Sequence, residues 1–396
     1  MNPVSAEPTD ILSRLAEAAQ MLPYGAFLFT TVLFILVLSL LIFVHEWGHY
    51  AAARSVGITV QRFAIGFGRP LVSWVDKHNT RWQIGWIPLG GYVQMLGQED
   101  LKPSKKSQQS GHYMAKTASQ RAWVISAGPL ANLVLGFVIL LMVMLGGEHK
   151  IKAEVGALVP EMPAAGVLQQ GDVVSHINGL PIASWEDFQT TVTQNTGTPL
   201  VLGVQRAGAL VNLTVTPKVV EHVDVFGDTH TVGRIGVSPA GTTFVVNHSV
   251  GGAVAAAAAK TYEFTALTLK SLWKLLIGAI GADNLTGPLG IANLTGQTAS
   301  SGFYALGMFM AVISINLFVV NLFPLPVLDG GHLVFLALEK LRGRPLGERA
   351  QEISFRVGLA CIVGLFLLST FNDIKRFGWL SPRAESATAA TAGTQR

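Results

Sequence analysis

The sequence predicts a mainly α-helical membrane protein with about four transmembrane helices, a membrane-associated β-loop on the cytoplasmic side and one folded domain inserted on the exported side. Half of the 396 residues are hydrophobic and only 13% are charged, whereas soluble domains carry about 25% charged residues. A soluble fold of this length needs a polar surface that this composition cannot supply. The net charge of +4 argues against nucleic acid as a partner and leaves membrane lipid as the expected surroundings. A single cysteine, Cys361, excludes an internal disulfide framework.

Four uncharged stretches approach the length of about 20 residues that crosses a bilayer. They are residues 26–44, 122–145, 302–328 and 357–371. The first stretch is too long for the apolar region of a signal peptide, and no small-residue cleavage site follows it, so we interpret it as a span. Residues 11–22 predict a short amphipathic helix before it, within an N-terminal segment of residues 1–22.

The charges of the connecting loops predict how the chain crosses the membrane. Lys and Arg outnumber Asp and Glu between the first two stretches, which places this loop in the cytoplasm by the positive-inside rule. Acidic residues outnumber basic ones between the second and third stretches, so that loop is expected on the exported side. Both chain ends then lie outside the cytoplasm.

The cytoplasmic loop contains an insert, residues 57–96, that lacks a helical pattern. Bulky residues alternate there and are separated by Gly85, Gly90 and Gly91, which is typical of β-hairpins. We expect this β-loop to belong to a unit of residues 23–147 that also contains the first two spans.

The exported loop, residues 148–249, is the only region that looks like a soluble domain. Residues 163–179 resemble the signature of PDZ domains in bacterial membrane and periplasmic proteases, as do a helix start at Trp185 and a strand at residues 200–206. A PDZ fold binds a peptide as an added strand. The alternative is a generic small β-domain, and only one copy of the signature is evident.

The first apolar stretch ends in His45-Glu46-Trp47-Gly48-His49. His45 and His49 are one helical turn apart, so both imidazoles point from one face of a helix and can bind one Zn²⁺. Glu46 is then placed to take a proton from a zinc-bound water and to pass it to the leaving amine. Ionisable residues at the end of an apolar span are costly unless they have a function. The alternative is an interfacial helix end with snorkelling polar groups.

A third zinc ligand must come from another part of the chain, and Asp329 is the best candidate. It ends the third apolar stretch, where a carboxylate needs a partner, and Pro324 and Pro326 interrupt the helix just before it. His332 is a weaker alternative, since it is expected to face the helix that follows.

Two amides, Asn316 and Asn321, lie inside the same stretch. They either hydrogen-bond neighbouring helices or hold the exposed backbone of an unwound substrate helix, and the sequence leaves both interpretations open.

The remaining divisions that the sequence predicts are a membrane-surface amphipathic region at residues 250–300, the last two spans at residues 301–378 and a flexible tail at residues 379–396.

Three segments together resemble the site-2 protease family, whose members are intramembrane zinc metalloproteases of the M50 type. They are the motif at residues 45–49, Gly128-Pro129-Leu-Ala-Asn132 in the second span, and residues 321–332. Residues 284–291 and 371–373 extend the likeness, which covers about residues 25–378.

The resemblance implies roles for particular residues. It assigns zinc binding to His45, His49 and Asp329, and it makes Glu46 the catalytic base. It implies that the 57–96 insert is a membrane-dipping β-loop that pairs with substrate as an added strand. The substrate contacts that it implies are Asn316, Asn321, Pro324 and Pro326.

We therefore expect an inner-membrane zinc metalloendopeptidase that carries out regulated intramembrane proteolysis, with its active site near the cytoplasmic side and its PDZ-like domain in the periplasm. The expected substrate is a single-span protein such as an anti-sigma factor whose exported part has already been cut, with remnant signal peptides as a second class. Close relatives of this type carry two tandem PDZ domains, whereas residues 218–241 here are either a remnant of a second copy or a closing strand pair.

Two other classes of protein remain as alternatives. A non-catalytic PDZ receptor could retain a relic metal site, but the intact Glu46 argues against such decay. A zinc transporter would show repeated halves or ligands on both sides of the membrane, and neither is evident in the sequence.

Overall fold

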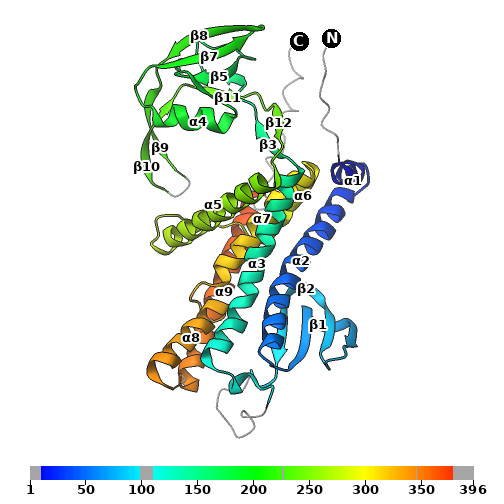
Figure 1. Cartoon of the computed structure of the whole chain (residues 1–396). Coiled ribbons are helices and arrows are strands. Elements are labelled where there is room, and N and C mark those ends of the chain that lie inside the picture. Colours follow the sequence, from blue (N-terminus) through cyan, green and yellow to red (C-terminus); the bar gives the residue numbers. More distant parts are fainter. Residues whose placement is uncertain (1–9, 99–109, 225–226, 345, 378–396) are drawn as a thin grey trace, which may run out of the picture. The chain divides into compact units, whose positions relative to one another are not determined.

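The computed structural model describes residues 10–98, 110–224, 227–344 and 346–377 (Figure 1). The chain divides into two compact units. The first, which we call the membrane unit, comprises Met1–Ile139, Thr261–Leu269 and Gly281–Arg396, and the second, the β unit, comprises Leu140–Lys260 and Lys270–Ile280. The tail predicted at residues 379–396 and residues 1–9 of the predicted N-terminal segment lie outside the described residues.

The membrane unit is built mainly from helices. They are α1 (Ile11–Gln20), α2 (Gly25–Ser55), α6 (Pro288–Ser300), α7 (Phe303–Asn321), α8 (Asp329–Arg342) and α9 (Glu348–Arg376), the greater part of α3 (Ala118–Gly146), and 3-10 turns at Tyr113–Ala115 and Ala282–Asn284. Four of the helices, α2, α3, α7 and α9, are long and apolar enough to cross a membrane. The four predicted spans are therefore confirmed as helices of suitable length and composition.

The third predicted span is shorter than the apolar stretch that predicts it. α7 ends at Asn321 rather than at residue 328, because Pro324 and Pro326 follow and lack the N–H groups that would continue the helix. The chain then turns, and a new helix, α8, begins at Asp329. The break places a carboxylate on the first turn of a helix at the end of an apolar segment.

Small residues allow α3 to pack closely against its neighbours. A Cβ on Gly48 of α2 would lie 2.3 Å from the backbone oxygen of Ala127 on α3. A Cβ on Gly136 of α3 would lie 2.7 Å from a side-chain carbon of Ile315 on α7. Such small residues permit the close backbone approach by which helices associate in lipid. The end of α2 that carries the histidines is therefore held directly against α3.

The insert at residues 57–96 is a curled antiparallel sheet, as its glycines and alternating residues predict. It consists of β1 (Val60–Val75) and β2 (Arg81–Met95). Both strands bend, so that residues 60–65 pair with residues 91–95 on one side and with residues 81–84 on the other. Residues 91–95, which we call the edge segment, pair with no second strand within the described part of the chain. Figure 1 shows this sheet beside α2.

The β unit contains a four-stranded sheet, a short helix and three strand pairs. The sheet has the order β6-β5-β7-β8, and the pairs are β3 with β12, β4 with β11, and β9 with β10. The bounds are β3 (Glu148–Ile151), β4 (Val155–Leu158), β5 (Val173–Ile177), β6 (Leu180–Pro181), α4 (Trp185–Gln194), β7 (Leu200–Arg206), β8 (Ala209–Val215), β9 (Lys218–Val223), β10 (Thr229–Arg234), β11 (Val237–Pro239) and β12 (Thr243–Val246). The described part of the segment 218–241 contains β9 paired with β10, and β11, which pairs with β4.

The β unit has its own core and an internal ion pair. Phe188 of α4 is 1% exposed and packs with apolar residues of β4, β5 and β7. Ser184 and Asp187 form a capping box at the start of α4, which satisfies two backbone N–H groups that the helix leaves free. The Arg206 guanidinium holds the pKa of the buried Asp172 carboxyl below its usual range.

The amphipathic region predicted at residues 250–300 begins with α5 (Val250–Leu276). This helix begins with Ser249, whose side chain accepts a hydrogen bond from the backbone N–H of Gly252. Part of α5, Thr261–Leu269, belongs to the membrane unit, and its other parts belong to the β unit.

Candidate active site

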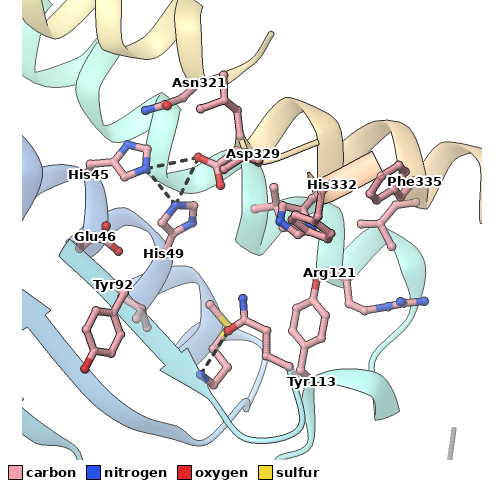
Figure 2. A pocket seen from close by; sticks show the side chains of 18 of the residues that line it. His45, Glu46, His49, Tyr92, Tyr113, Arg121, Asn321, Asp329, His332 and Phe335 are labelled. Atoms are coloured by element: carbon pink, nitrogen blue, oxygen red, sulfur yellow. Dashed lines mark hydrogen bonds and ion pairs between the residues drawn. The ribbon is translucent and has the colours of Figure 1, made fainter. Parts of the chain in front are cut away.

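Three side chains from two helices converge near the end of α2. His45 and His49 lie one turn apart, with their Nε2 atoms separated by 3.1 Å. Asp329, on the first turn of α8, brings its Oδ2 to 3.3 Å from the Nε2 of His45 and to 3.5 Å from the Nε2 of His49. Figure 2 shows the three side chains pointing toward one another. We call these residues the metal-binding group, because their ligand atoms lie close enough to share one ion.

The spacing of these atoms fits a zinc ion. Ligand atoms that surround zinc tetrahedrally at about 2.0–2.1 Å are about 3.4 Å from one another, which is close to the three distances in the metal-binding group. Two imidazole nitrogens and one carboxylate oxygen are ligands that catalytic zinc sites use, with the fourth position kept for water or substrate. The residues present therefore fit zinc in both chemistry and spacing.

The surface of α3 is shaped around the His49 imidazole. The Nδ1 of His49 lies 2.9 Å from the backbone oxygen of Val124. Because a carbonyl can only accept a hydrogen bond, Nδ1 carries the proton and Nε2 keeps a lone pair for a metal. Gly128 makes room for the ring, since a Cβ there would lie 2.2 Å from the Nε2 of His49.

Glu46 lies beside the metal-binding group and is only 9% exposed. A Cβ added to Gly91 of the edge segment would lie 2.9 Å from the Cγ of Glu46, so the two residues are in close contact. Both residues line the cavity that also contains the metal-binding group. The predicted catalytic base therefore lies between the metal-binding group and the edge segment.

Two glycines allow the chain to present Asp329. A Cβ on Gly330 would lie 2.2 Å from the backbone oxygen of Leu322, and one on Gly331 would lie 2.2 Å from that of Leu325. Because these are backbone contacts, a larger residue at either position would open the turn between α7 and α8. The sequence Asp-Gly-Gly is thus a steric requirement of this turn.

A cavity of about 420 Å³ contains the metal-binding group and extends to an ion pair between helices. Arg121 at the start of α3 donates hydrogen bonds to both carboxylate oxygens of Glu339, with lengths of 2.5 Å and 3.2 Å. Glu339 lies on α8, the helix that begins with Asp329. The bidentate pair therefore joins α3 to α8 and supports the position of Asp329.

The four predicted substrate contacts occupy different places. Asn321 lines the cavity together with the metal-binding group. Asn316 accepts a hydrogen bond of 2.6 Å from the Thr268 hydroxyl of α5. Pro324 is exposed, and Pro326 lies against Gly358 of α9. Of the four residues, Asn321 is the one that the structure brings to the cavity wall.

His332 lines the cavity but lies outside the metal-binding group. Its ring packs against Phe355 of α9, with 5.3 Å between ring centroids. The expectation that His332 faces the following helix is therefore confirmed.

The structure adds residues to which the sequence alone assigns no role. Val124, Gly128 and Asn132 follow at intervals of four along α3, and each lies next to a histidine of the metal-binding group. Their spacing is that of one helix face. The segment 128–132 is recognisable as a motif, but the sequence does not show which helix it faces.

A metal-binding group near the end of an apolar helix, with a buried carboxylate next to it, fits a membrane metallopeptidase. Comparison with known families agrees. Residues 33–365 match the model of peptidase family M50, and the chain belongs to this family. It is a site-2-type zinc metalloprotease with four helices suited to span a membrane.

Relatives of known name match nearly the whole chain. The putative zinc metalloprotease Atu1380 of Agrobacterium fabrum is 39% identical, with 86% of this chain and 94% of that protein covered. The metalloprotease MmpA of Caulobacter vibrioides is 33% identical, with 89% and 96% covered. The regulator of sigma-E protease RseP of Salmonella typhimurium is 31% identical over 440 residues, with 87% and 98% covered.

Proposed function

We propose that the chain cleaves single-span membrane proteins within the bilayer, as a step of regulated intramembrane proteolysis in the bacterial inner membrane. The substrate class that we favour is an anti-sigma factor already shortened by a first protease, because one relative is named a regulator of sigma-E protease. Remnant signal peptides, which are also short single spans, form a second class. The observation that carries the proposal is a metal-binding group at the end of an apolar helix, next to the edge segment, which pairs with no second strand in the described part of the chain.

The metal-binding group would hold the metal ion, and Glu46 would transfer the proton. His45, His49 and Asp329 would hold zinc, which lowers the pKa of a coordinated water to about 7 and polarises the scissile carbonyl. Glu46 would take the proton of the attacking water and deliver it to the leaving nitrogen. Glu46 is buried against the edge segment and lines the cavity that contains the metal-binding group.

The edge segment and Asn321 would hold the substrate backbone open. A helix in lipid keeps its amide groups hydrogen-bonded, so the substrate must unwind before its carbonyl can be attacked. An unwound stretch can pair with the free edge of a sheet as an added strand, and the edge segment lines the cavity beside Glu46. Asn321, on the cavity wall, offers an amide to a backbone group that the substrate helix has released.

We further propose that the active site lies near the cytoplasmic side and that the β unit is a periplasmic PDZ-like domain. The excess of Lys and Arg between the first two spans supports the first placement, and the acidic loop between the second and third spans supports the other. The single 163–179 signature and the helix-and-sheet content of the β unit are consistent with a peptide-binding domain.

A cleavage assay with purified protein tests the proposal. Wild-type chain and the Glu46→Gln variant are incubated in detergent with a tagged single-span peptide, with a chelator and after zinc is restored. We expect cleavage by the wild type, loss with the chelator, recovery with zinc, and at least about a 100-fold lower rate for Glu46→Gln at normal zinc content. Equal cleavage by both proteins would show that Glu46 is not the base.

A further inference from the structure

Asn132 of α3 is a buried side chain with one unused hydrogen-bonding atom. The residue is 0% exposed, and its amide Nδ2 lies 3.2 Å from the Nδ1 of His45. Its Oδ1 has no hydrogen-bond partner among the described residues. A buried amide oxygen without a partner destabilises the folded chain, so this arrangement needs an explanation.

The placement of the amide conflicts with metal binding by His45. If Nδ2 donates to Nδ1, the proton of the neutral imidazole must sit on Nε2. Nε2 is the atom that faces His49 and Asp329, and a protonated Nε2 cannot bind a metal. The oxygen and nitrogen of an amide have the same shape, so their assignment follows from the hydrogen bonds around them. A half-turn of the Asn132 amide brings its oxygen to the Nδ1 of His45 and places the amide nitrogen where Oδ1 has no partner among the described residues. The His45 proton then sits on Nδ1, and Nε2 is free for a metal.

We propose that Asn132 is a positioning residue whose Oδ1 accepts the Nδ1–H of His45 and thereby keeps the His45 Nε2 lone pair free for zinc. The proposal depends on the ligand set proposed above. It gives both histidines the same kind of support from one helix, since Val124 accepts from the Nδ1 of His49 through its backbone oxygen. Partners of this kind fix the tautomer and the ring orientation of metal-binding histidines.

A second contact holds Asn132 in place. The Ser314 hydroxyl of α7 donates a hydrogen bond of 2.7 Å to the backbone oxygen of Asn132, and Ser314 is fully buried. The segment that carries the Asn132 amide is therefore fixed between α2 and α7. Because this bond uses the backbone, it remains available when the Asn132 side chain is changed.

The test compares Asn132→Asp with Asn132→Leu in the full-length chain. Asp has the shape of Asn, and its ionised side chain accepts hydrogen bonds but donates none. Leu has a similar volume, and its side chain neither accepts nor donates hydrogen bonds. Zinc affinity is measured by competition with a chromogenic chelator, and the ligand geometry is followed by the visible spectrum of the cobalt(II)-substituted protein. We expect Asn132→Asp to bind zinc within about threefold of the wild type, and Asn132→Leu to bind it about 10- to 100-fold more weakly with an altered cobalt spectrum.

Other outcomes would overturn the proposal. Asn132→Leu binding zinc as the wild type does would show that no acceptor is needed, and Asn132→Asp losing zinc would show that the amide donates. The Asp variant decides between acceptor and donor even if the Leu variant does not fold. The His45→Ala variant distinguishes failure of the ligand set from failure of the Asn132 proposal. Unchanged zinc affinity in His45→Ala would refute the ligand set itself. Lost zinc affinity in His45→Ala, together with normal affinity in Asn132→Leu, would refute only the role of Asn132.

Discussion

Gly128 has no side chain, and this leaves room for the ring of the metal-binding residue His49. The glycine faces the His49 imidazole from α3, and a Cβ at this position would lie 2.2 Å from Nε2, 2.5 Å from Cε1 and 2.7 Å from Cδ2 of the ring. Real Cβ atoms do not approach other atoms this closely. The ring is also tied to Val124 through its Nδ1, so it cannot move away without losing that hydrogen bond.

We therefore predict that Gly128→Ala displaces the His49 ring and weakens zinc binding about 10- to 100-fold, the range seen when a histidine loses its support. Zinc affinity of the purified chain, measured by chelator competition, checks the prediction. Gly364→Ala on α9 is the matched control, since it makes the same change within a candidate span where a Cβ meets nothing within 4 Å. Equal zinc affinity in the two variants would contradict the steric argument.

Single residues differ in how well the sequence predicts them. His45 and His49 are predictable because their spacing of four fixes one helix face, and Asp329 because a carboxylate at the end of an apolar stretch needs a partner. Asn316 and Asn321 are five residues apart, so they lie about 140° apart around an α-helix. That geometry explains why one of them meets Thr268 and the other lines the cavity, but the sequence does not show which neighbour each one meets.

The edge segment passes close to the proposed base, Glu46. At Gly91 it passes so near to α2 that a Cβ would lie 2.8 Å from a side-chain carbon of Ile42 and 2.9 Å from the Cγ of Glu46. The same Cβ would lie 2.9 Å from the backbone oxygen of Ala64 in β1, next to Ile65, the residue that pairs with Gly91. Glycine at this position thus sets the distance between the strand and Glu46.

We predict that Gly91→Ala lowers kcat about 10- to 100-fold, because shifts of about 1 Å at a reacting group have effects of this size. Zinc content is expected to stay normal, since the three atoms nearest to the added methyl belong to Ile42, Ala64 and Glu46 and not to the metal-binding group. Single-turnover cleavage of a tagged transmembrane peptide and metal analysis of the same sample provide the two measurements. A wild-type rate would show that Glu46 does not depend on this strand.

An ion pair between the buried Asp172 and the partly exposed Arg206 joins the residue before β5 to the end of β7. Asp172 is 1% exposed and accepts hydrogen bonds of 2.8 Å and 2.7 Å from Arg206. The pKa of Asp172 is lowered by this guanidinium, whereas the unfolded chain has an aspartate pKa of about 3.9. A lowered folded-state pKa means that the pair stabilises the fold above about pH 4 and that this stabilisation is lost as the pH falls toward the folded-state pKa.

We predict that Asp172→Asn lowers the opening free energy of β7 by about 2 kcal/mol at neutral pH, the range for a hydrogen bond to a charged group. The variant should also lose the decrease in stability that the wild type shows below about pH 4. Hydrogen exchange of Leu200–Arg206 in the full-length chain, corrected for intrinsic rates, measures both effects. Glu186→Gln, which changes an exposed carboxylate on α4, serves as the control and should behave as the wild type does.

The whole molecule combines an M50 membrane unit with one β unit. The alignment to the Salmonella relative extends over 440 residues, which is longer than this 396-residue chain, so that relative contains inserted residues that this chain lacks. In the segment 218–241, which the sequence interprets as a remnant of a second domain or a closing strand pair, the described residues form β9 and β10, which pair with each other, and β11, which pairs with β4. The number of spans and the two inserts follow from hydropathy and glycine patterns. These patterns do not predict which helices are neighbours, because a span that is apolar on all sides has no stripe that distinguishes one neighbour from another.

Zinc would act on the whole membrane unit as a link between α2 and α8, two helices far apart in the sequence. A ligand that binds only the folded state stabilises it by about 4 kcal/mol at 1,000 times its Kd. We therefore predict that zinc at this excess raises the midpoint of thermal unfolding of the full-length chain above the midpoint measured with a chelator, and that Asp329→Asn removes most of the increase.

The matched control is Asp228→Asn in the β unit, where Asp224, Asp228 and His230 form a second group that could hold a metal. Lys270 and Lys274 already pair with Asp228, so this control should keep the full zinc-dependent increase. If Asp228→Asn instead lost it while Asp329→Asn kept it, the stabilising zinc would be bound in the β unit and not between α2 and α8.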